Sequence, residues 1–432
     1  MKSKFVMSTF ILIIGGFITK IISMFIKIVM TRLLGTYGIG IYMLISPTFM
    51  LLISLASLGL PVAISKLVAE DNRNNKNLVF LCFPITLFIN IIIMILLFFF
   101  SSYISDSLLH EPRVRLGITC IGFVLPFISI SSVLRGYFFG KQKMIPHVVS
   151  NVTEDLIRLL VIFIGIPIFL NKGIEYAVAF IVLSNIVSEL TSIFVLFFFL
   201  PKKFKIKKND LVFDRRNVRD VLGISLPTTG SRLIGNIGYF FEPIIMTYFL
   251  LRSGYSNSFI INEYGVINGY VMPLVLLPSF FTLAISQAII PVISYNYSHG
   301  DIVNTRLKMR QGIFFSLLIG IPCTLIFLFI PDIPLRFIYN TDLGISYIRV
   351  MAVVCLLHYI QSPISSCLQA MGMARDSMMG TLFGVIIRCL FLIIGCSLHI
   401  GMWGLIIATS VNIIFVTFYD YNKVRGYLKR NR

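Results

Sequence analysis

The chain has 432 residues, of which 57% are hydrophobic and 13% are charged, and its formal net charge is +19. Apolar runs of about 20 residues, the length that a helix needs to cross a bilayer, recur along the whole sequence. This composition excludes a soluble catalytic domain and a nucleic-acid-binding protein, because the basic residues lie between apolar helices, where anionic lipid headgroups would meet them. We expect an all-α polytopic membrane protein that is not an enzyme and has no cofactor.

Twelve membrane-spanning helices are predicted. Their expected ranges are 5–33, 39–65, 77–101, 115–138, 147–170, 174–200, 218–250, 264–292, 309–330, 345–369, 377–397 and 400–420. The first run contains two lysines and lacks a small-residue cleavage site, so we expect a span rather than a signal peptide. The polar stretch 201–217 divides the chain into an N-terminal six-helix bundle, 1–200, and a C-terminal six-helix bundle with a basic tail, 218–432.

The distribution of basic residues predicts the orientation. With an inside N-terminus, 25 of the 37 lysines and arginines lie in inner segments, and six lie in or beside outer loops. Cytoplasmic loops of membrane proteins carry such an excess of positive charge. We therefore expect both termini and the linker 201–217 to be cytoplasmic, in a bacterial plasma membrane.

Polar stripes cross spans one and seven at bilayer depth. A cation costs about 3 kcal/mol there on insertion scales, so it should face water, a partner or an anionic substrate. In span one the stripe follows helical spacing, and a second stripe occupies span seven. We predict that these residues line a central cavity for a phosphate or pyrophosphate group: Lys20, Ser23, Lys27, Thr31, Arg232 and Asn236.

The alternative is that the intramembrane cations only neutralise buried carboxylates. Glu154 and Arg158 stand four residues apart on span five, a spacing at which side chains of a helix pair. Glu189 and Glu242 are further candidate partners, and Arg388 in span eleven could be structural in the same way. No spacing of cysteine, histidine or acidic residues suggests a metal site, and the seven cysteines are interpreted as small core residues.

An internal repeat and several prolines predict where the helices bend. Residues 47–65 resemble residues 278–294, with Pro47 and Pro61 matched to Pro278 and Pro291. Six helices per half give parallel repeats, whose substrate site belongs at their interface near the midplane. We expect these four prolines to make spans two and eight bendable. The pair Glu242 and Pro243 in span seven is predicted to be a hinge or an ion-coupling site.

Particular strings of residues resemble a known family. The stretch from Lys20 to Lys27, the stretch 31–42 and the string GLPVAISKLVAE at 59–70 are similar to polysaccharide-type flippases of the multidrug/oligosaccharidyl-lipid/polysaccharide exporter superfamily, including its sporulation branch. The resemblance implies two six-helix bundles in a V and alternating access. It also implies an undecaprenyl-linked precursor of cell wall, spore cortex or polysaccharide as substrate. The lipid II flippases of this superfamily have two more spans and arginines in spans two and eight, which this sequence lacks.

Other readings remain open at this point. A cation-coupled multidrug exporter of the same superfamily would favour acidic residues, whereas the predicted stripes are basic. An integral-membrane glycosyltransferase would need a large outer loop with carboxylates, and the outer loops 102–114, 251–263 and 331–344 are short. A non-transporting scaffold is the third alternative. Anionic lipids, the lipid-linked substrate and a coupling ion are the partners that we expect.

Overall fold

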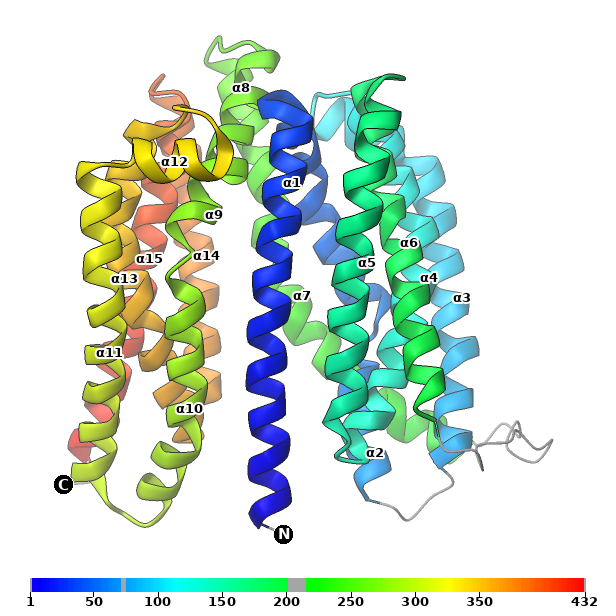
Figure 1. Cartoon of the computed structure of the whole chain (residues 1–432), viewed down its shortest axis with the longest axis vertical. Coiled ribbons are helices and arrows are strands. Elements are labelled where there is room, and N and C mark those ends of the chain that lie inside the picture. The colour runs from blue at the N-terminus through cyan, green and yellow to red at the C-terminus, as the bar shows by residue number, and fades with distance from the viewer. Residues whose placement is uncertain (1, 71–74, 201–214, 431–432) are drawn as a thin grey trace. The chain divides into compact units, whose positions relative to one another are not determined.

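The computed structural model describes residues 2–70, 75–200 and 215–430, and all regular secondary structure in these ranges is helical (Figure 1). Contacts divide the chain into two compact units, Met1–Phe240 and Phe241–Arg432. The boundary falls inside helix α7, Arg215–Arg252, one residue before Glu242. The predicted linker 201–217 lies outside the described residues except for its last three, which begin α7.

The helices of the N-terminal unit agree with the first six predicted spans to within a few residues, except that spans one and two join. They are α1 (Lys2–Ala56), α2 (Leu60–Ala69), α3 (Asn75–Ser102), a π-helical segment (Tyr103–Leu108), α4 (Val114–Gly140), α5 (Met144–Leu170) and α6 (Ile174–Phe198), followed by the first part of α7. Spans one and two are two helical arms of α1 that meet at a kink, where Gly35 has non-helical backbone angles.

The C-terminal unit contains the rest of α7 and the remaining predicted spans. Its further helices are α8 (Asn257–Gly265), a π-helical segment (Val266–Val271), α9 (Met272–Val275), α10 (Ser279–Ser298), α11 (Ile302–Phe329), α12 (Asp332–Tyr339), α13 (Ile345–Ala370), α14 (Ala374–Ser397) and α15 (Trp403–Arg430). Span eight is divided among α8, α9 and α10. The short amphipathic helix α12 lies in the segment 331–344, which we expected to be a loop.

Ten helices in the described ranges are long and apolar enough to cross a membrane. Twelve spans were predicted, and two differences explain the smaller number. The first two spans belong to one continuous stretch that includes α1 and α2. Helix α5 is not among the ten, because three charged residues, Glu154, Asp155 and Arg158, lie near its middle. The prediction of an all-α multi-pass membrane protein is confirmed.

The helical breaks in spans two and eight match the prolines of the two halves in a different way from the sequence repeat. The first break follows α1 at residues 57–59, and Pro61 lies in the first turn of α2. The second break is at residues 276–278, and Pro278 directly precedes α10. Pro47 and Pro291 lie inside α1 and α10. The helical breaks thus place Pro61, rather than Pro47, in the position that corresponds to Pro278.

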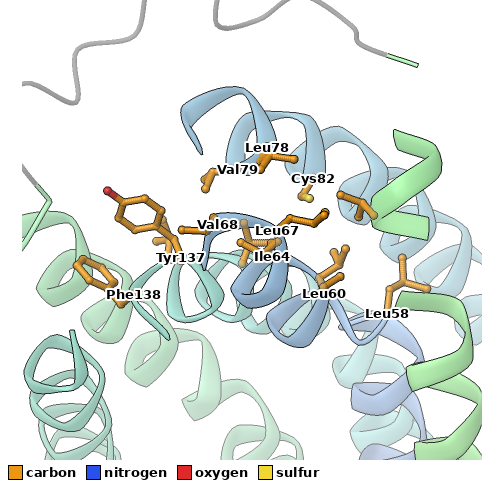
Figure 2. Close-up of a cluster of buried hydrophobic side chains, with 14 of the residues drawn as sticks. Leu58, Leu60, Ile64, Leu67, Val68, Leu78, Val79, Cys82, Tyr137 and Phe138 are labelled. Carbon is orange, nitrogen blue, oxygen red and sulfur yellow. The ribbon is translucent and has the colours of Figure 1, made fainter. Parts of the chain in front are cut away.

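Buried apolar side chains of α2, α3 and α4 form a core in the N-terminal unit (Figure 2). Val221 of α7 belongs to this core, and the side-chain amide of Asn217 donates to Asn77 Oδ1 at 3.0 Å. At Gly59, φ is +59°, and an added Cβ would lie 2.9 Å from the carbonyl oxygen of Ser225. Glycine at this position therefore permits both the turn and the close approach of α7, so the first part of α7 packs with the N-terminal unit.

Candidate functional site

A cavity of about 190 Å³ lies in the N-terminal unit between the two arms of α1 and helix α5. It is lined by Ser23, Ile26, Lys27 and Met30 of the first arm, by Tyr42, Met43 and Ser46 of the second arm, and by Arg158 of α5. Its volume is below the roughly 300–1,000 Å³ of pockets that enclose a drug-sized ligand. It can therefore take a small charged group rather than a whole saccharide.

The bend at Gly35 creates this cavity. The glycine has φ 67° and ψ −175°, a combination that is essentially restricted to glycine. A straight helix would place Lys27 and Tyr42 more than 20 Å apart along its axis, at about 1.5 Å for each residue. With the bend, both side chains line one space. The conformation of a single residue thus brings the predicted polar face of span one opposite the second arm.

Lys27 and Arg158 are the two charged residues in the cavity wall. Arg158 was expected to pair with Glu154, and this expectation is wrong. Glu154 forms a close ion pair with Arg135 of α4, whose guanidinium also lies 3.6 Å from Glu189 Oε2. The same guanidinium donates to Ser192 Oγ at 2.8 Å. Both glutamates are thus at ion-pair distance from Arg135 rather than from Arg158.

One carboxylate borders the cavity without being part of its lining. Asp155 is hydrogen-bonded to the hydroxyl of Ser23 and interacts electrostatically with Arg158, three residues further along α5. Asp155 thus interacts with two of the polar side chains that line the cavity, Ser23 and Arg158. An anion in the cavity would meet a lysine, an arginine and hydroxyl groups, which are the donors that bind phosphate oxygens.

The structure brings two of the six predicted cavity residues together, Ser23 and Lys27. Lys20 and Arg232 are exposed and do not line this cavity. Thr31 is buried and donates to the carbonyl oxygen of Lys27 at 2.8 Å, and Asn236 donates to Ser54 Oγ at 2.7 Å. These last two side chains make contacts within the N-terminal unit, and a role for them in binding substrate stays a prediction.

Sequence reasoning did not select Arg158, Tyr42 or Ser46. The available signal was an arginine in an apolar span, but the nearby Glu154 offered a partner at helical spacing. Only the positions of α4 and α5 show that Arg135 takes that partner instead. Tyr42 and Ser46 gave no signal, because their position opposite Lys27 depends on the bend at Gly35.

A second buried charged pair lies in the C-terminal unit. Arg388 of α14 forms an ion pair with Glu242 of α7 at 2.5 Å, and the hydroxyl of Tyr264 donates to the other carboxylate oxygen at 3.3 Å. Arg388 also donates to Thr409 at 3.3 Å. Both charged side chains are nearly buried, and their ion pair links α7 to α14. The predicted function of Glu242 and Pro243 as a hinge or an ion-coupling site stays a prediction.

Two protein-family models match this chain. The family model described as Polysaccharide biosynthesis protein matches residues 5–296, and the MatE model matches residues 267–394. The chain is 36% identical over 428 residues to Stage V sporulation protein B of Bacillus subtilis (strain 168), covering 96% of this chain and 82% of that protein. It is 21% identical over 458 residues to the Lipid II flippase MurJ of the same organism, covering 98% and 83%.

The fold is similar to that of solved transporters. An inward-facing multidrug resistance MATE family transporter of the MOP superfamily superimposes with a TM-score of 0.73 at 17% identity, covering 96% of this chain and 95% of that one. At this identity the likeness shows the fold alone. Together with the family matches, this similarity confirms the family resemblance that residues 20–42 and 59–70 suggested.

Proposed function

Because the chain belongs to the polysaccharide biosynthesis protein family, we propose that it is a flippase that moves an anionic lipid-linked saccharide across the bacterial plasma membrane by alternating access. An undecaprenyl-linked precursor of cell wall, spore cortex or polysaccharide is the proposed substrate. The names of two relatives, Stage V sporulation protein B and Lipid II flippase MurJ, support this class of substrate.

The observation that carries the proposal is the pair of cations in one small cavity. Lys27 and Arg158 line it together with two serine hydroxyls, while the nearby glutamates are bound to Arg135. Arginine and lysine hydrogen-bond strongly to phosphate oxygens, and arginine can do so in a bidentate way. We infer that the cavity holds the phosphate or pyrophosphate of the lipid-linked sugar, with the saccharide and the lipid tail outside it.

Two further cations are part of the proposed path of the anionic group. Lys20 and Arg232 are exposed in the same unit, and we propose that they contact the anionic group before or after it occupies the cavity. Both termini would be cytoplasmic, since that orientation places most basic residues inside. Neither catalysis nor a cofactor is needed for this function.

The multidrug exporter is the alternative within the same fold. An exporter of organic cations needs acidic groups that are free to face its substrate. In the N-terminal unit Glu154 and Glu189 are both at ion-pair distance from Arg135, and Asp155 interacts with Ser23 and Arg158. The cavity wall itself carries two cations. These observations favour an anionic substrate.

The test is transport by the purified full-length protein in proteoliposomes. A fluorescently labelled undecaprenyl diphosphate-linked saccharide should move between leaflets faster than in protein-free vesicles. A matched lipid-linked sugar without the diphosphate should not. Equal acceleration of both lipids, or export of organic cations without flipping, would contradict the proposed substrate class.

A further inference from the structure

A second carboxylate in the C-terminal unit differs from Glu242 in having no cation beside it. Asp420 of α15 is 1% exposed, and one of its oxygens, Oδ2, is hydrogen-bonded to the hydroxyl of Ser365 on α13. The other oxygen, Oδ1, has no hydrogen-bond partner. Among the described residues, no lysine, arginine or histidine forms an ion pair with Asp420.

The charged groups of α14 and α15 nearest to Asp420 are already paired with each other. Helix α14 presents Gly380, where an added Cβ would lie 2.9 Å from Asp420 Oδ1. One turn earlier, Asp376 of α14 faces the same region, and its own charge is bound by Lys423 at 3.0 Å and by Tyr427 at 2.5 Å. The lysine nearest in sequence to Asp420 is thus already paired with another carboxylate.

The remaining neighbours bring no cation either. Helix α13 presents the Ser365 hydroxyl, and α10 contains no charged or histidine residue. Arg306 of α11 donates to the carbonyl oxygen of Leu428 at 3.4 Å, two turns further along α15 than Asp420. The neighbouring core, which includes Ile364, Val424 and other side chains, is apolar.

An ionised carboxylate is unfavourable in such a place, because burial removes the water that stabilises its charge and no positive group replaces that water. A protonated carboxyl group avoids this cost, since it is neutral and needs only ordinary hydrogen bonds. A metal cation is a poorer occupant, because no group of three or more histidine, cysteine or acidic residues exists among the described residues.

We propose that Asp420 is a proton-binding site of the C-terminal unit. It carries a proton when α13, α14 and α15 pack as described, and it releases the proton only when water reaches the carboxyl group. Loss of the proton would leave a negative charge beside Asp376, so the deprotonated form favours separation of α15 from its neighbours. In a transporter, such a group links proton binding to the packing of three helices, whatever the transported substrate is.

Infrared spectroscopy of the full-length protein in phosphatidylcholine vesicles near neutral pH tests this directly. A protonated carboxylic acid has a C=O stretching band that is separate from the bands of a carboxylate. The wild type should show this band, and the difference between its spectrum and that of Asp420→Asn, which has nearly the same shape, should contain the component that belongs to Asp420. Glu242→Gln is the matched control, because Glu242 forms an ion pair with Arg388 whereas Asp420 has no such partner, and this variant should retain the band.

A second variant keeps the proposal testable if Asp420→Asn folds poorly. Ser365→Ala removes the hydrogen bond to Oδ2, so the band should persist and shift to higher frequency. The proposal is overturned if folded Asp420→Asn keeps the full band, or if Ser365→Ala leaves its frequency unchanged. Disappearance of the band on addition of sodium ions at constant pH would also overturn it, since the site would then bind a metal cation.

Discussion

Buried charges in this protein fall into groups with different surroundings, and the surroundings indicate their roles. Arg135 and Arg388 each bind a carboxylate of a neighbouring helix, which is a structural arrangement. Lys27 and Arg158 instead share a cavity. Arg135 and Arg388 have a carboxylate of a neighbouring helix at ion-pair distance, and Lys27 and Arg158 instead line a shared cavity, so the partner distinguishes a structural cation from a proposed binding one.

The ion pair between Arg388 and Glu242 should contribute to stability. Arg388→Ala leaves Glu242 buried without its cation, and loss of one partner of a buried pair costs about 3–5 kcal/mol in the free energy of unfolding. Denaturant unfolding in detergent micelles measures this. Arg336→Ala is the control, because both side chains of the pair between Arg336 and Asp342 are exposed, and a solvent-screened pair should contribute little to stability. Equal losses in the two variants would show that burial of the first pair is unimportant.

At the scale of helices, apolar length and polar boundaries were sufficient to predict most of the fold. The spans that became α3, α4, α5 and α6 were predicted within a few residues, because each is an apolar run between polar or glycine-containing loops. The cavity could not be predicted, because it depends on the backbone of Gly35 and on which helix supplies a partner for Glu154. Neither is encoded in the spacing of residues along one helix.

Gly35 should be required for the bend in α1. Gly35→Ala forces an alanine into a conformation that costs about 1–3 kcal/mol, so the variant should be less stable and should lose affinity for the anionic substrate. Gly16→Ala, in the same helix with nothing within 4 Å of the added Cβ, is the control. This control should be neutral or gain roughly 0.5–1 kcal/mol, because alanine favours helix over glycine. Thermal unfolding together with substrate binding would separate the two outcomes.

Pro243 lies close to the point in α7 where the two compact units divide. A proline inside a helix removes a backbone hydrogen bond and allows bending. If this position is a hinge, Pro243→Ala should raise thermal stability and slow transport, with little change in substrate affinity. Pro167→Ala in α5, which lies within one unit, provides a comparison. Unchanged transport by Pro243→Ala at normal expression would remove the hinge from the account.

At the scale of the whole molecule, charge distribution predicts how the chain crosses the membrane. Helix α5 separates the segment around Lys143 from the segment around Lys172. In a variant without native cysteines, Lys143→Cys should react with an impermeant maleimide only after cells are permeabilised. Lys172→Cys should react in intact cells, because the positive-inside rule places it outside. The opposite pattern would invert the predicted topology and place both termini outside.

The central claim is that Lys27 and Arg158 bind the anionic group of the transported lipid, and one measurement tests it most directly. The apparent affinity for undecaprenyl diphosphate-linked saccharide should be measured from flipping in proteoliposomes containing wild type, Lys27→Ala, Arg158→Ala or the control Arg336→Ala. A lost hydrogen bond to a charged group costs about 1.5–3 kcal/mol, so each cavity variant should lose about 10- to 150-fold in affinity while the control is unchanged. Wild-type affinity in both cavity variants, at equal reconstitution, would contradict the claim.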